Sequence, residues 1–265
     1  MGVVRFLSAV DVALPPELEA RLGAVTLRGT SVAARATAFA VPEMGVCLDI
    51  GRLTEALVAQ PVVLLSHGHL DHLSGILAYL NVRARFHPEP PARVVAPSGV
   101  AEGLRAALAV MPGMESVRTR VALERAVLPA EAGDTVELPG GSATAFAADH
   151  GPASLGWALR QPGRDRPVLV YAGDGSVEPF RADPGLLDAD AAVVECTFVE
   201  PNRRIAARIA RHAHVLDWIE VAPSLPCDRL VLAHLPALPA AELEALTAPL
   251  AAVWPGELVL WAPRG

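Results

Sequence analysis

Short apolar segments separated by Gly, Pro and polar residues run through the first half of the chain. Apolar or alternating segments of this length predict β-strands, which we place at residues 25–27, 36–41, 46–50, 62–65 and 94–96. Helices are predicted between them at residues 52–59, 74–80 and 98–108, the last beginning at Ser98, a residue type that favours helix N-termini. Strands and helices therefore alternate in this half.

The second half repeats this pattern. Strands are predicted at residues 143–147, 191–195, 230–233 and 258–261, and a hairpin at residues 155–159 and 168–171 around the polar turn 161–166. Helical segments are predicted at residues 203–222 and 240–251. Strands in both halves with helices between them predict an α/β fold, in which two sheets pack together and helices cover their outer faces.

The composition fits a single domain over residues 1–265. Hydrophobic residues make up 52% of the chain, enough for a large core, but no uninterrupted apolar run reaches the roughly 18 residues of a membrane span. The N-terminal sequence lacks the apolar run of a signal peptide, so we expect a cytoplasmic protein with no membrane partner. The three cysteines are too scattered for a disulfide framework or a zinc knuckle.

The charge of the chain is acidic. The formal net charge is −7, and the 22 basic residues are all Arg, with no Lys. A broad nucleic-acid surface usually needs a basic face, so this charge argues against one. Arg is nevertheless the side chain that best fits phosphate geometry, so phosphate recognition at a few positions stays open.

Residues 66–72 read Ser-His-Gly-His-Leu-Asp-His, directly after the strand predicted at 62–65. The imidazoles of His67, His69 and His72 and the carboxylate of Asp71 thus fall within six positions. These groups are metal ligands, and they can be buried together only around a shared cation. In an extended segment His67 and His69 point the same way, whereas Asp71 and His72 face a second position. The spacing therefore predicts two adjacent metal ions, a site that activates water and stabilises an oxyanion.

Three further metal-ligand types follow the ends of predicted strands. His150 comes after the strand at 143–147, Asp174 after the strand at 168–171, and His234 after the strand at 230–233. Strand ends of an α/β protein converge on one crevice, so we expect these side chains to join the cluster at 67–72. Each position alone would be weak evidence, and the combination favours a shared metal site.

The motif and the strand-end ligands together resemble the metallo-β-lactamase fold, over nearly the whole chain. The resemblance implies an αββα sandwich with two zinc ions at the edge of its sheets. Carried over by position, one zinc would be held by His67, His69 and His150, a second by Asp71, His72 and His234, and Asp174 would bridge both. Asp49, in Leu-Asp-Ile-Gly, matches an early Asp of the family that supports the His loop from behind.

Within this superfamily the chain is most similar to short-form ribonuclease Z, which removes the 3′ trailer from precursor tRNA. The similarity rests on Leu-Asp-Ile-Gly-Arg at 48–52, Ser-Leu-Gly-Trp at 154–157 and Glu-Cys-Thr-Phe at 195–198. It implies that Glu195 and His212 form a pair that passes a proton to the leaving oxygen. His214 lies close enough in sequence to take that role instead, and Glu195 could also be a structural cap.

The chain also departs from ribonuclease Z. That family carries a long tRNA-binding arm between the strands that here hold Trp157 and Gly173, and only fifteen residues separate these two positions. Two further departures are Gly175, where the family usually has Thr, and Leu235, where it usually has Ser or Thr. The hydrolytic residues are thus present, while the arm that grips tRNA is missing.

These features lead to one main hypothesis and two rivals. The main hypothesis is a zinc-dependent phosphodiesterase or endoribonuclease, in which a zinc-bridging hydroxide attacks phosphorus and Asp71, Glu195 and His212 take part in catalysis. Its partner would be a phosphodiester, with RNA included, and the resemblance implies a homodimer. The first rival is a hydrolase of a small thioester, lactone or cyclic nucleotide on the same scaffold. The second is a metal-stabilised binding module without activity.

Overall fold

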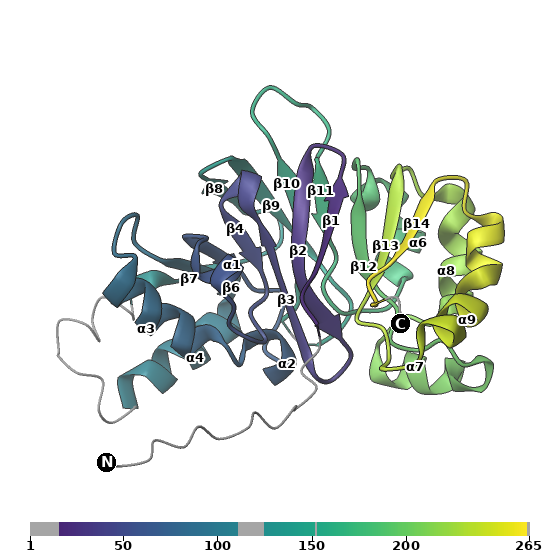
Figure 1. Ribbon diagram of the computed structural model, residues 1–265, viewed down its shortest axis with the longest axis horizontal. Coiled ribbons are helices and arrows are strands. Elements are labelled where there is room, and N and C mark those ends of the chain that lie inside the picture. Colours follow the sequence, from purple (N-terminus) through teal and green to yellow (C-terminus); the bar gives the residue numbers. More distant parts are fainter. Residues whose placement is uncertain (1–15, 111–124, 152, 264–265) are drawn as a thin grey trace, which may run out of the picture.

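The computed structural model describes residues 16–110, 125–151 and 153–263. Two seven-stranded sheets pack face to face, and helices lie on the outer face of each (Figure 1). This is the αββα sandwich expected from the sequence. No helix in these ranges combines the length and apolarity needed to cross a bilayer.

The two sheets are built in the same way. The first contains β1 (Leu18–Leu22), β2 (Val25–Val32), β3 (Ala36–Val41), β4 (Val46–Leu48), β5 (Val62–Leu64), β6 (Arg93–Pro97) and β7 (Val127–Ala130), in that order. The second contains β8 (Thr135–Leu138), β9 (Gly141–Ala147), β10 (Leu155–Arg160), β11 (Leu169–Tyr171), β12 (Ala192–Glu195), β13 (Arg229–Ala233) and β14 (Glu257–Leu260). In each sheet the first four strands pair antiparallel and the last three are added in parallel.

Helices connect the parallel strands and cover the sheets. The first half contains α1 (Glu55–Val58), α2 (Leu70–Leu73), α3 (Ile76–Phe86) and α4 (Ser98–Val110). The second contains α6 (Glu178–Ala182), α7 (Arg204–Ala210), α8 (Val215–Val221) and α9 (Ala240–Val253). Three apolar cores result, one between the sheets around Phe39 and Trp157, one under α8 and α9 around Trp218, and one under α3 and α4 around Tyr79. Burial on both faces explains why the central strands are apolar throughout.

Most predicted elements are present, including the hairpin of β10 and β11. The prediction was wrong for the helix at 203–222, which is two helices separated by residues 211–214. Three strands were not expected, namely β1, β7 and β8, which are four or five residues long. The metal-ligand motif, expected as a loop, continues into α2.

Candidate metal centre

The ligands predicted from the motif and the strand ends lie together. His67 follows β5, His150 follows β9, Asp174 follows β11 and His234 follows β13. Their elements belong to both sheets, so the site is formed where the two sheets meet. The donor atoms fall into a group formed by His67, His69, His150 and Asp174 and a group formed by Asp71, His72 and His234, with all donors of a group within 4.8 Å of one another.

Asp174 belongs to the first group and also faces the second. Its Oδ2 is 3.3 Å from Nε2 of His72, 3.5 Å from Nε2 of His234 and 3.9 Å from Nε2 of His67. Burial raises the pKa of Asp174, but the charges of His72 and His234 outweigh it, so the pKa lies well below its usual range. An ionised carboxylate therefore faces donors of both groups.

Two buried ring nitrogens have no hydrogen-bond partner. Nε2 of His67 and Nε2 of His72 are both buried, and the approach of Asp174 to His72 does not have hydrogen-bond geometry. A buried polar atom left unpaired costs about 1–3 kcal/mol. Burial lowers the pKa of His67 to about 3, so this ring is neutral, the form that binds metals. The donors and the orphaned nitrogens fit divalent metal ions, and the imidazole and carboxylate chemistry suits zinc.

Asp49 orients the motif from behind. It is fully buried with φ +57°, and its carboxylate accepts hydrogen bonds from Ser66 N and Oγ at 2.7 and 2.6 Å and from His72 Nδ1 at 2.7 Å. The hydroxyl of Tyr171 donates a further bond. The bond from Nδ1 leaves Nε2 of His72 as the nitrogen that faces the site. Such outer hydrogen bonds fix ring orientation in metal sites.

Sequence reasoning did not identify the contribution of Tyr171. It is the last residue of β11 and is buried in the core between the sheets. A partial signal exists, since Tyr171 lies three positions before Asp174 at the end of an apolar strand. The sequence contains nothing that pairs Tyr171 with Asp49, because the contact crosses from one sheet to the other.

Glu195 and His212 form a hydrogen-bonded pair. Nδ1 of His212 donates to Oε1 of Glu195 at 2.9 Å, and that oxygen also accepts from Ala213 N at 2.8 Å. The ring centroid of His212 lies 4.6 Å from that of His150, and the His212 ring stacks on the His234 ring with 5.9 Å between their centroids. Burial lowers the pKa of His212, but the hydrogen bond and charge of Glu195 outweigh it and raise the pKa. A ring with proton-transfer chemistry thus lies beside both groups of ligands.

Thr197 connects this pair to the metal ligands. Its hydroxyl donates to Oε2 of Glu195 at 2.7 Å and accepts from Nδ1 of His234 at 2.9 Å. His234 therefore carries its proton on Nδ1, and Nε2 faces Asp71 at 3.2 Å. Burial raises the pKa of Asp71, but the close approach of His234 and the nearby His72 lower it to about 2.

His214 lies elsewhere. It is fully buried, its Nδ1 accepts from Leu216 N as the N-cap of α8, and its Nε2 donates to the carbonyl of Glu200. The cap uses Nδ1 and the carbonyl uses Nε2, so neither ring nitrogen of His214 is left for a substrate. His212, and not His214, is the ring that Glu195 binds.

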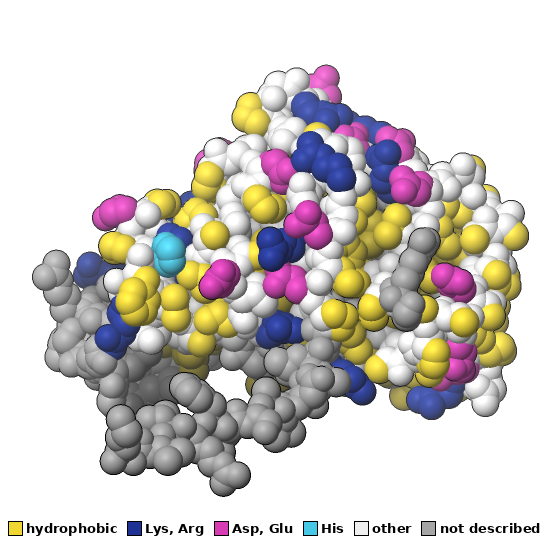
Figure 2. All heavy atoms as spheres, in the orientation of Figure 1, with side chains coloured by type: hydrophobic (Ala, Val, Ile, Leu, Met, Phe, Trp, Pro, Cys, Tyr) yellow, Lys and Arg dark blue, Asp and Glu magenta, His cyan; other side chains and the backbone are white. Residues whose placement is uncertain are grey.

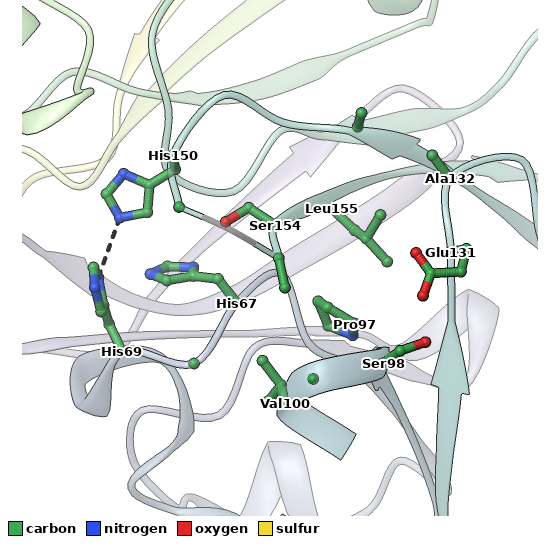
Figure 3. Close-up of a pocket in the computed structure, with 15 residues that line it drawn as sticks. His67, His69, Pro97, Ser98, Val100, Glu131, Ala132, His150, Ser154 and Leu155 are labelled. Atoms are coloured by element: carbon green, nitrogen blue, oxygen red, sulfur yellow. Dashed lines mark hydrogen bonds between the residues drawn. The ribbon is translucent and has the colours of Figure 1, made fainter. Parts of the chain in front are cut away.

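A cavity of about 830 Å³ opens beside the first group. Its lining includes His67, His69 and His150 at one end and Ser98 and Glu131 at the other (Figure 3). Ser98 begins α4 and Glu131 follows β7 of the first sheet, whereas Ala147 and Leu155 belong to β9 and β10 of the second, so both sheets contribute to the cavity wall. Sequence analysis did not identify Glu131, because nothing in the chain near it has the pattern of a site.

The surface in Figure 2 mixes charges of both signs. Arginines and carboxylates lie beside each other near the top of this view. Among the ion pairs of the described residues, Arg166 binds Asp188 and Asp228 at 2.8 Å each. Arg229 likewise binds Glu257 at 2.7 Å. Arginines neutralised in this way do not form a continuous basic surface on this face.

The fold and the two ligand groups define a protein of the metallo-β-lactamase fold. Residues 50–235 match the model of the β-lactamase superfamily domain, so the chain belongs to this family. The metallo-β-lactamase fold implies divalent metal binding, in agreement with the His and Asp groups described above.

Relatives of known name are ribonuclease Z proteins. The chain is 25% identical to the chloroplastic tRNase Z TRZ2 of Arabidopsis thaliana in an alignment of 246 residues that covers 80% of this chain and 68% of that protein. It is 34% identical to the nuclear ribonuclease Z of Triticum aestivum over 65 residues, 24% of this chain and 37% of that protein. The resemblance to ribonuclease Z drawn from the sequence is confirmed by these matches.

Solved structures show the same fold. The metallo-β-lactamase fold protein YhfI from Bacillus subtilis superposes with a TM-score of 0.66 at 17% identity, covering 87% of this chain and 93% of that one. The short form of human tRNase Z (ELAC1) superposes with a TM-score of 0.58 at 16% identity, covering 78% and 91%. At these identities the likeness extends to the fold and leaves the substrate open.

Proposed function

We propose that the chain is a zinc-dependent phosphodiesterase of the ribonuclease Z type that holds two zinc ions. One ion would be held by His67, His69 and His150 and the other by Asp71, His72 and His234, with Asp174 between them. Bound zinc supplies Lewis-acid stabilisation of negative charge and activation of water. By analogy with ribonuclease Z, we also propose a cytoplasmic homodimer.

The Glu195–His212 pair is the observation that carries this proposal. Glu195 binds Nδ1 of His212, which leaves Nε2 as the ring nitrogen available to a substrate. The raised pKa favours the protonated ring, which can donate its Nε2 proton to a leaving oxygen and then regain it from water. Glu195 stabilises the charged form of the ring throughout.

The need for a proton donor separates cleavage of a phosphodiester from cleavage of a thioester. An alkoxide leaving group is strongly basic and departs slowly without a proton. A thiolate departs without a proton, because its conjugate thiol has a pKa of only about 8.5. A placed and charged His212 therefore supports cleavage of a phosphodiester more than cleavage of a thioester.

A single variant with a matched control tests the proposal. His212→Ala should retain the bound metal and lose about 10²–10⁴-fold in kcat on an alkyl phosphodiester, because general acid catalysis is removed, and it should lose much less on bis-p-nitrophenyl phosphate, whose weakly basic p-nitrophenolate departs without a proton. His87→Ala is the control, because His87 is exposed at the end of α3 and away from the ligand groups.

Assays on other ester classes decide between the candidates. Zinc-loaded protein that hydrolyses a thioester or lactone rapidly and both phosphodiesters poorly would assign the chain to the first rival class. Protein with no zinc affinity, measured by elemental analysis and calorimetry, would remove the metal hydrolase proposal altogether.

A further inference from the structure

The cavity beside His67, His69 and His150 has a chemical character of its own (Figure 3). Beyond the histidines its walls are largely apolar, with Val100, Ala147 and Leu155 among them. Among the described residues that line it, no Arg is present and Glu131 holds the one carboxylate. A volume of about 830 Å³ lies within the range of small-molecule sites.

Hydrogen-bonding groups are placed along this cavity. Ser154 lines the wall near His150, but its Oγ is shielded from the open cavity. Ser98 and Gly99 line the other end, in the first turn of α4, where backbone N–H groups have no partner within the helix. A ligand with polar but uncharged atoms would satisfy these groups.

The position of Glu131 argues against a negatively charged group in the cavity in addition to the phosphate that would be cleaved. The N-terminus of a helix favours negative charge, and here Glu131 lines the same end of the cavity as Ser98 of α4 (Figure 3). A polynucleotide carries one negative charge for roughly every 3.4 Å of each strand, so a chain entering the cavity would place a phosphate near this carboxylate. No basic side chain among the described lining residues would offset the repulsion.

We infer that this cavity binds an uncharged, hydrogen-bonding arm of the substrate, so that the substrate class is a small phosphodiester with a neutral arm and not a polynucleotide. The inference rests on the proposed function, since it assumes that the scissile phosphate lies at the histidine end. The short connection between β10 and β11, residues 161–168, agrees with a small substrate, because no long arm extends there.

Matched substrates test the arm. Three p-nitrophenyl phosphodiesters share a leaving group and differ in a 2-carbamoylethyl, 2-aminoethyl or 2-carboxyethyl arm. We expect kcat/KM for the carbamoylethyl ester to exceed that for the carboxyethyl ester by about tenfold, with the aminoethyl ester no worse than the carbamoylethyl ester. Calorimetric Kd values of the matching unreactive phosphonates, measured on zinc-loaded protein, should follow the same order without any turnover.

Variants at Glu131 assign the preference to this residue. Glu131→Gln should raise kcat/KM for the carboxyethyl ester about three- to tenfold and change the carbamoylethyl ester less than twofold, the range expected for one partly screened charge. Glu131→Arg should make the carboxyethyl ester the best of the three. Glu137→Gln is the control, because Glu137 is an exposed carboxylate of β8 that does not line the cavity.

The outcomes separate this inference from the proposed function. Hydrolysis of all three esters at similar rates, unchanged by the Glu131 variants, would overturn the neutral arm and leave the phosphodiesterase intact. Phosphonates that bind in the expected order, with none of the esters hydrolysed, would support the neutral arm and overturn the phosphodiesterase. Tighter binding of the carboxyethyl phosphonate would overturn the inference directly.

Discussion

Asn in place of Asp49 should destabilise the protein strongly even without metal. The carboxylate is fully buried and accepts four hydrogen bonds, two of them from Ser66 and one each from His72 and Tyr171. Asn keeps the size of the side chain and tolerates the left-handed backbone at φ +57°. The variant therefore tests the charge and the acceptors of Asp49 with little change in packing.

The magnitude follows from the hydrogen bonds. The Asn oxygen can take the place of Oδ2 and keep three of the bonds, now to a neutral acceptor. Its NH₂ group then faces the N–H of Ser66, so two buried donors meet without an acceptor. Losing one charge-assisted bond costs about 1.5–3 kcal/mol and an unsatisfied buried donor about 1–3 kcal/mol. After relaxation we expect a loss of about 3–5 kcal/mol, a large part of the roughly 5–15 kcal/mol that stabilises a typical protein.

Urea unfolding of chelator-treated protein, followed by far-ultraviolet circular dichroism, measures this loss. Asp165→Asn is the control, an exposed carboxylate whose replacement should change the free energy of unfolding by less than about 0.5 kcal/mol. If Asp49→Asn costs less than about 1 kcal/mol, the hydrogen-bond network is not the support that we describe. A companion titration should show zinc affinity reduced about 10–100-fold, because His72 is no longer held in orientation.

Three further changes have definite expected outcomes. Thr197→Val should lower zinc affinity or kcat about 10–100-fold, because His234 loses the hydroxyl that accepts its hydrogen bond. Thr197→Ser keeps a hydroxyl and should stay near wild type in both measurements. Equal losses in the two variants would mean that the hydroxyl is unimportant. Gly51→Ala should lower the melting temperature by several degrees, since a Cβ there would lie 1.8 Å from the carbonyl oxygen of Asp71, and an unchanged melting curve would refute this close approach. Removing metal with a chelator should lower stability by about 2.7 kcal/mol for each zinc site, relative to protein at zinc a hundredfold above its Kd, and added zinc should restore it; a melting temperature indifferent to zinc would exclude tight binding.

Local sequence determined much of the fold and the metal ligands. The strands at 36–41 and 62–65 were predicted within about one residue, because burial on both faces requires continuous apolar runs. The grouping of His67, His69 and Asp71 was visible because these residues alternate along one short segment of the sequence. His150, Asp174 and His234 could be identified since parallel strand ends converge on one edge.

Tertiary contacts decided the segment that holds His212. Residues 203–222 contain no Gly, and the break in the helix has no local signal. Glu195 accepts from the N–H of Ala213, and the carbonyl of Phe198 accepts from the N–H of Val215, so partners outside the segment replace the helical hydrogen bonds. Helix propensity amounts to a few tenths of a kcal/mol per residue, less than these bonds contribute.

The support behind the ligands and the cavity also depended on the tertiary structure. Tyr171 reaches Asp49 across the two sheets. Glu131 and Ser98 line the same end of the cavity only because β7, which precedes Glu131, pairs with β6, which precedes α4. Periodicity reports which face of an element is buried, but it carries no information on which distant side chain lies opposite. The sequence by itself thus determined the elements and the candidate metal ligands, whereas the packing of the two sheets decided the hydrogen-bond partners and the shape of the cavity.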